Sequence, residues 1–176
     1  MKIKHILVIL AAFFTVFSNA ACRRVTPHDV FLPDPNCKKL GYYSSNYTNY
    51  HYGYYIYSMD ATLDTAATIT SISADIKGSN TAIAAIYDNS LYLIAQSAQT
   101  SVSDGWNKIE IPATMLQPGT YRLAIATIND SSSGIRSESG KGMRYATSYS
   151  FGSAPLSIDS SSPGNYALLL YGNYCP

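Results

Sequence analysis

Hydrophobic and polar residues alternate along short runs of this chain, and turn-forming residues separate one run from the next. The run from Thr120 to Ile128 shows the pattern clearly. Leu123 and Ile125 fall on one face of an extended strand, and Ala124 and Ala126 fall on the other. A period of two is typical of a β-strand. The larger side chains predict a core face, and the small alanines opposite predict a second face that is also partly covered.

Seven further runs of this type follow one another from residue 40 onward, and none of them has a helical period. They cover residues 50–58, 68–76, 82–87, 91–97, 106–111, 143–150 and 165–174. Strands of this length need a second layer to bury their faces. We therefore predict that residues 40–176 form one all-β domain. The expected fold is an antiparallel two-sheet β-sandwich of about eight strands, jelly-roll-like, and a barrel is the alternative.

The N-terminal segment has the pattern of a secretory signal peptide over residues 1–20. Lys2 and Lys4 precede an uncharged apolar run of 12 residues, and small residues before Ala21 mark a cleavage site. The run is shorter than the roughly 20 residues that cross a bilayer, so we expect no membrane span. Residues 21–39, with three prolines, read as an irregular arm. The mature chain is expected to be secreted, into a periplasmic or extracellular space.

Cys22 allows a second interpretation of the same segment, as a lipid-modified N-terminus. A lipoprotein signal places an aliphatic residue three positions before the modified cysteine, and this chain has Asn19 there. Ordinary secretion is therefore the preferred interpretation.

The net charge of the chain does not alter the predicted fold and points to no charged partner. Removing the signal peptide takes away two lysines, so the formal net charge moves from +1 to −1. Dispersed, nearly balanced charge gives no electrostatic footprint for nucleic acid. The roughly 156 mature residues suit one domain with a core of its own.

Three cysteines remain after export, and an oxidising compartment favours at least one disulfide. Cys37 precedes the first strand-like run and Cys175 follows the last. We predict a bridge between these two, although three cysteines allow three single pairings.

Catalytic chemistry has few candidate residues. His28 and His51 are the histidines left after export, and no nucleophile, zinc or phosphate-loop motif is present. Glu110 and Glu138 are possible members of a glycosidase pair, but one alternates with a lysine on a polar strand face and the other lies in a loop. The oxygen-rich turns at residues 88–89 and 129–130 lack the spacing of a calcium loop, and Asx turns explain them. We expect no enzyme activity, no metal and no cofactor.

Tyrosine is the unusual component, with 16 in the chain and eight of them between Tyr42 and Tyr57. In the stretch Y-H-Y-G-Y-Y-I-Y, strand alternation places Tyr50, Tyr52 and Tyr54 on one face. Phenol rings combine flat apolar area with a hydrogen-bonding edge, which suits both sugars and protein interfaces. These three residues are predicted to form a binding platform, and a core lining with wet hydroxyls is the alternative.

Trp106 is the only tryptophan. It alternates with Lys108 and Glu110, which predicts an exposed position, whereas a bulge after Gly105 would turn it into the core. Both positions stay open at this stage. An exposed Trp106 would belong to the same kind of platform as the tyrosines.

Between residues 68 and 128 the chain reads T-I-T-S-I-S-A-D-I, A-I-A-A-I-Y-D, L-I-A-Q-S, G-W-N-K-I-E-I-P and P-G-T-Y-R-L-A-I-A. This order resembles the secreted jelly-roll modules of bacterial surface proteins and carbohydrate-binding-like accessory domains. The resemblance implies a secreted jelly-roll fold and assigns no ligand residue.

The sequence thus predicts a secreted, non-catalytic module that attaches to a glycan or a surface polymer through tyrosine and tryptophan. The alternative is a structural subunit of an extracellular or surface assembly. Its copies would then contact one another through the N-terminal arm and the tyrosine-rich strand.

Overall fold

The computed structural model describes residues 37–176, apart from residues 79, 129–131, 160–162 and 175–176. The signal peptide, Cys22, His28 and Cys175 therefore lie outside the described residues. All regular structure in the described part is β-strand, so no helix there is long and apolar enough to cross a membrane. The expectation of an all-β chain is confirmed.

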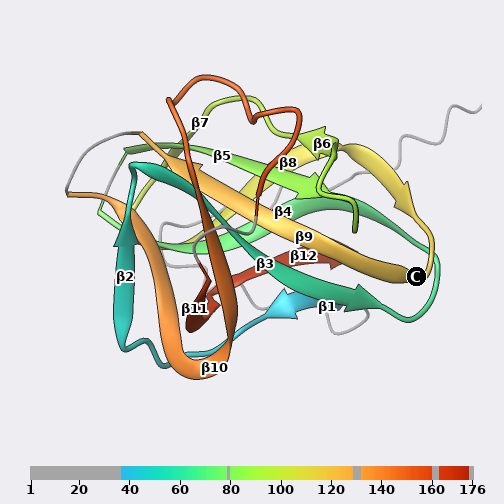
Figure 1. Ribbon diagram of the computed structural model, residues 1–176, viewed down its shortest axis with the longest axis horizontal. Coiled ribbons are helices and arrows are strands. Elements are labelled where there is room, and N and C mark those ends of the chain that lie inside the picture. The colour runs from blue at the N-terminus through green and yellow to red at the C-terminus, as the bar shows by residue number, and fades with distance from the viewer. Residues whose placement is uncertain (1–36, 79, 129–131, 160–162, 175–176) are drawn as a thin grey trace, which may run out of the picture. The chain divides into compact units, whose positions relative to one another are not determined.

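Twelve strands are present in the described residues, and Figure 1 labels them in chain order. They are β1 (Lys38–Tyr42), β2 (Asn49–Tyr52), β3 (Tyr55–Leu63), β4 (Ala67–Lys77), β5 (Asn80–Tyr87), β6 (Leu93–Gln96), β7 (Thr100–Val102), β8 (Gly105–Leu116), β9 (Gly119–Thr127), β10 (Gly134–Ser148), β11 (Gly164–Leu168) and β12 (Leu170–Tyr174).

All strand pairs are antiparallel, and hydrogen bonds connect the strands into one sheet with the order β1-β12-β4-β10-β3-β9-β5-β6. β8 pairs with β4, β7 pairs with β5, and both β2 and β11 pair with β10. The first part of β10 pairs with β2, β4 and β11, and its last part pairs with β3. β10 therefore links two branches of the sheet.

The bend in β10 makes this link possible (Figure 1). The register of β10 shifts between Ser139 and Arg144, and Gly140 there has a φ of 74°. Left-handed backbone at this angle favours glycine, because a Cβ would be strained. One strand can thus change neighbours halfway along its length.

The main core lies where side chains of both branches meet. It takes Ile69, Ile72 and Ile109 from β4 and β8, and Leu123 and Ile125 from β9, all at most 1% exposed. A second cluster covers the opposite face of β9, where Ala124 and Ala126 pack with the loop residues Ala154 and Ile158. The expectation that both faces of this strand are covered is confirmed.

The count of about eight strands is too low, and the hydrogen-bonded network is one sheet where two were expected. Two of the added strands, β2 and β7, have only four and three residues. Strands this short carry too little alternation to be recognised from sequence. The last predicted strand is also divided, because β11 ends at Leu168 and β12 begins at Leu170.

Gly53 divides the tyrosine-rich run into two strands. The chain turns after Tyr52, whose carbonyl oxygen accepts a 3.0 Å hydrogen bond from the backbone N–H of Tyr54. A Cβ at Gly53 would collide with the carbonyl oxygen of Ile128 and the hydroxyl of Thr127. Only glycine fits this close approach, so the turn occurs here and residues 50–58 do not form one strand.

Candidate functional site

One face of the branch around β4 carries three of the six exposed aromatic rings of the described residues, together with three cations. Strand register defines this face. Trp106 lies opposite Asp75, and Tyr50 lies opposite Arg136, whose guanidinium reaches Asp75. We call it the aromatic face, and it consists of Lys39, Tyr43, Tyr47, Tyr50, Tyr52, Lys77, Trp106, Arg136 and Tyr171.

Trp106 sits at the centre of a cluster of three rings. Its ring centroid is 5.2 Å from that of Tyr43 and 5.2 Å from that of Tyr171. Tyr171 is buried, Trp106 is half-buried, and Tyr43 lies outermost with 51% exposure. Trp106 therefore lies on the same side of β8 as Lys108, as strict alternation predicts. It is half-buried and not exposed, because the rings of Tyr43 and Tyr171 cover part of it. Trp106 supports the outer ring and is not itself an open platform.

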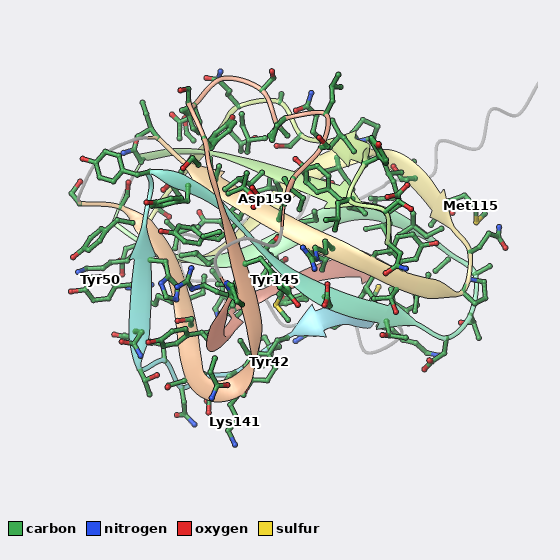
Figure 2. All side chains as sticks on the ribbon, in the orientation of Figure 1. Tyr42, Tyr50, Met115, Lys141, Tyr145 and Asp159 are labelled. Atoms are coloured by element: carbon green, nitrogen blue, oxygen red, sulfur yellow. The ribbon has the colours of Figure 1, made fainter. Side chains whose placement is uncertain are left out.

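Tyr50 and Tyr52 form the second ring pair, on β2. Their centroids are 5.1 Å apart in an edge arrangement, and the Lys77 ammonium lies 3.4 Å from the Tyr50 centroid. Tyr50 is 40% exposed and projects from β2 in Figure 2. Two of the three predicted platform tyrosines are therefore together on one face.

Tyr54 does not join them. It lies in the turn after Gly53, outside both β2 and β3, and is 53% exposed. The prediction treated residues 50–58 as one strand, and the turn at Gly53 ends the alternation before it reaches Tyr54. Its place in the platform is taken by Tyr47, which lies over the Arg136 guanidinium at 4.8 Å and is 54% exposed.

A buried ion network underlies the rings. Arg136 donates to Asp75 Oδ1 at 2.7 Å and to Asp104 Oδ1 at 2.8 Å, and it also donates to the carbonyl oxygen of Ile76. The side chains of Arg136 and Asp75 are each 10% exposed, whereas that of Asp104 is 64% exposed. The network joins β10, β4 and the turn before β8, so it fixes the strands that carry the rings.

The charges of this face shift the ionisation of its groups. Burial raises the pKa of Asp75, and the hydrogen bond from Arg136 opposes that shift. The backbone N–H of Gly78, followed by Arg136, lowers the pKa of Asp104. Hydrogen bonding from Tyr52, followed by that from Lys77, lowers the pKa of Tyr50. Negative charge is thus favoured on Asp104 and Tyr50, whereas burial disfavours it on Asp75.

His51 points to the other side of β2, where sequence reasoning identified no site. Its Nε2 lies 2.9 Å from the hydroxyl of Ser137, and its ring packs on Tyr57 and Tyr166 with centroids 5.3 and 5.0 Å away. Ser137 is fully buried. A buried hydroxyl has no access to a substrate, so this histidine–serine pair acts in packing.

We expect His51 to make the stability of the domain depend on pH. Burial and the nearby charge of Arg144 lower the pKa of His51 to about 4, against about 6.5 in an unfolded chain. The unfolded state then binds more protons between these values. The free energy of unfolding should therefore fall as the pH drops from about 6.5 to 4, by about 1–2 kcal/mol after allowance for solvent screening.

Urea unfolding at pH 7.0 and pH 4.5 checks this for the native chain and a His51→Gln variant. Other titrating groups are common to both, so the variant should lose less stability on acidification. Equal losses in the two proteins would contradict the assignment to His51.

The other candidate residues have partners of their own. Glu110 pairs with Lys108 at 2.6 Å, and Glu138 accepts a 2.6 Å hydrogen bond from Tyr42. Asp88 accepts a 2.9 Å hydrogen bond from the backbone N–H of Tyr92, four residues along the chain, which is a local turn bond but not the predicted Asx turn. Residues 129–130 lie outside the described residues. No group of three or more potential metal ligands occurs among the described residues.

Two open hollows lie away from the aromatic face. One, of about 410 Å³, is lined by Asp88, Gly119 and Tyr121 among others. The other, of about 250 Å³, is lined by Lys38, Met115 and neighbours. No residue of the aromatic face lines either of them.

Sequence reasoning missed Tyr43, Tyr47, Tyr171, Lys39, Lys77 and Arg136 as members of the site. The density of tyrosine was a signal for the first two, which belong to the same eight-tyrosine segment. No local sequence pattern marks the three cations as site residues, because strand pairing alone brings them to the rings. Comparison of the chain with known protein families, with curated proteins and with solved structures finds no match.

Proposed function

We propose that this chain is a secreted, non-catalytic binding module that attaches to a glycan or surface polymer through its aromatic face. One observation carries the proposal. Three tyrosine rings, those of Tyr43, Tyr47 and Tyr50, are each at least 40% exposed on the same face. Exposed rings of this kind offer apolar area to the C–H face of a sugar and a hydroxyl edge to its alcohols.

The rings are held in place before any ligand arrives. Tyr43 rests on Trp106, Tyr47 rests on Arg136, and Tyr50 packs edge-on against Tyr52. Preorganised rings lose little conformational entropy on binding, which is a requirement for useful affinity at an open surface.

The sandwich architecture is part of the same proposal. Side chains from the β3-β9-β5 branch and from the β4-β8-β12 branch enter one buried cluster, which is what two facing layers would give. The resemblance to secreted jelly-roll modules over residues 68–128 supports this arrangement. So does the signal-peptide pattern, with lipid attachment at Cys22 as its alternative.

Absence of catalysis is likewise proposed, and the partners of the polar residues support it. Glu110 and Glu138 are bound to Lys108 and Tyr42, and the serine of the His51 pair is buried. None of these residues belongs to the aromatic face.

Assembly of copies is the second candidate, and a separate observation favours it. The edge strand β6 and its flanking loop expose Tyr92 at 63%, Ile94 at 39% and Leu156 at 81%. The loop hydrogen-bonds to β6 through Leu156 and Leu93, so a second chain would contact the exposed apolar side chains of this surface.

The test of the proposed function is a triple variant, Tyr43→Ala/Tyr47→Ala/Tyr50→Ala. We expect retention on immobilised polysaccharides to fall by at least about tenfold, because each lost ring removes about 0.5–1.5 kcal/mol of contact. A glycan array identifies the polymer, and thermal melts check that the fold is kept.

Tyr92→Ala is the matched control, since it removes an exposed ring from another surface. Retention that survives the triple variant would refute the aromatic face as the binding surface. Sedimentation of the native protein and a Tyr92→Ala/Leu156→Ser variant separates the candidates. An oligomer that is lost in this variant, without glycan retention, would favour assembly.

A further inference from the structure

Two lysines of the aromatic face lie directly over its exposed rings. The Lys39 ammonium is 3.2 Å from the Tyr43 centroid and 4.6 Å from the Tyr171 centroid. The Lys77 ammonium is 3.4 Å from the Tyr50 centroid. A cation held on a ring face at these distances is fixed in position by the ring's quadrupole.

Neither lysine forms a salt bridge with another residue of the described part of the chain. The salt bridges of the described residues involve Lys108, Arg122 and Arg136, and none involves Lys39 or Lys77. Arg136 is different, because Asp75 and Asp104 compensate its charge. Three cations and these two carboxylates leave a formal excess of one positive charge, and the two lysines are the cations of the face without a contact ion pair among the described residues.

This arrangement distinguishes between neutral and charged sugars. A neutral sugar could use the tyrosine rings but would leave both ammonium groups without a contact ion pair, and Asp104 would attract Lys77 only at longer range. A sugar with a carboxylate would contact a ring and pair with the adjacent cation at once. Complementary charge of this kind provides specificity and salt-sensitive affinity.

We infer that the aromatic face binds an acidic polysaccharide, with sugar carboxylates paired to Lys39 and Lys77 and sugar rings in contact with the parts of Tyr43 and Tyr50 that the ammonium groups leave exposed. The inference rests on the proposed function and adds the chemical class of the polymer. Because the two cations are carried by β1 and β4, with β12 between them, more than one sugar unit takes part.

The experiment compares polygalacturonate with the same polymer after full methyl esterification, which removes the charge and keeps the backbone. The native protein should bind the free acid at least about tenfold more tightly. Lys39→Gln/Lys77→Gln should lose most of that preference, and Lys39→Arg/Lys77→Arg should keep it. Lys141→Gln is the charge-matched control, since Lys141 lies at the bend of β10, apart from Tyr50 on β2 (Figure 2).

Three outcomes would overturn the inference. Equal binding of the acid and the ester, with loss in the tyrosine variant, would refute the acidic preference and leave the proposed function intact. Equal binding of polyglutamate, which has charge but no sugar rings, would show that charge alone acts. No binding of any polysaccharide would remove the proposed function together with the inference. Thermal melts of each variant show that the fold is retained.

Discussion

Arg136→Ala is expected to lower the free energy of unfolding by about 3–5 kcal/mol at neutral pH. The Asp75 carboxylate is 10% exposed, and Arg136 is its only ion-pair partner among the described residues. Removing the guanidinium leaves a buried charge without compensation, which costs far more than the net contribution of the pair. Urea unfolding of the native and variant proteins measures the loss.

The free energy of unfolding that Arg136→Ala loses should be smaller at acid pH. Burial already raises the pKa of Asp75, and without Arg136 it should rise further, above the value in the unfolded chain. The folded variant then binds more protons than the unfolded one, so its stability rises as the pH falls through that range. The difference between variant and native protein should therefore shrink from pH 7 to pH 4.

Two controls separate the buried charge from lost packing. Arg122→Ala removes an arginine of similar burial, but its partner Asp60 is 46% exposed and stays solvated, so the loss should stay below about 2 kcal/mol. Asp75→Asn/Arg136→Met removes both charges and should recover much of the loss. A double variant as unstable as Arg136→Ala would contradict the buried-charge explanation.

A disulfide between Cys37 and Cys175 is expected to raise the free energy of unfolding by about 5 kcal/mol. Such a bridge closes a loop of about 140 residues, and in the chain-entropy model the effect grows with loop length. Cys175 lies outside the described residues, so the bridge stays a prediction. The register of β1 and β12 supports it, because Lys38 pairs with Tyr174, and in the sequence Cys37 precedes the first residue and Cys175 follows the second. Cys37 has an interaction partner in the structure and is not a free thiol.

Peptide mapping without reduction identifies the pairing, and urea unfolding with and without reductant measures its contribution. Cys22→Ala serves as the control, because it should leave both results unchanged. A peptide that joins Cys22 to Cys37 or to Cys175 would refute the assignment. A stability that does not respond to reductant would refute the magnitude.

Strand content could be predicted from sequence because alternation is a local property. From Leu123 to Ala126, the alternation of side chains assigns each residue to one of the two strand faces. The structure buries both faces as expected. The same local logic placed Tyr50 and Tyr52 together. It failed at Tyr54, because the contact that forces the turn at Gly53 comes from Thr127 and Ile128, more than 70 residues away.

The composition of the aromatic face was decided by tertiary structure. Tyr43, Trp106 and Tyr171 come from three distant parts of the chain, and their contact depends on which strands flank β4. Arg136 meets Asp75 for the same reason. Strand pairing is non-local, and the alternation that identifies a strand does not name its neighbour.

By itself, the sequence determined that this chain forms short antiparallel strands, that one of them is covered on both faces, and that tyrosine dominates its surface chemistry. The tertiary structure decided the number of strands, the bend that joins two branches through β10, and the partners of every cation on the aromatic face. The physical reason is that side-chain alternation depends on adjacent residues, whereas ring stacking, ion pairing and burial depend on which strands lie side by side.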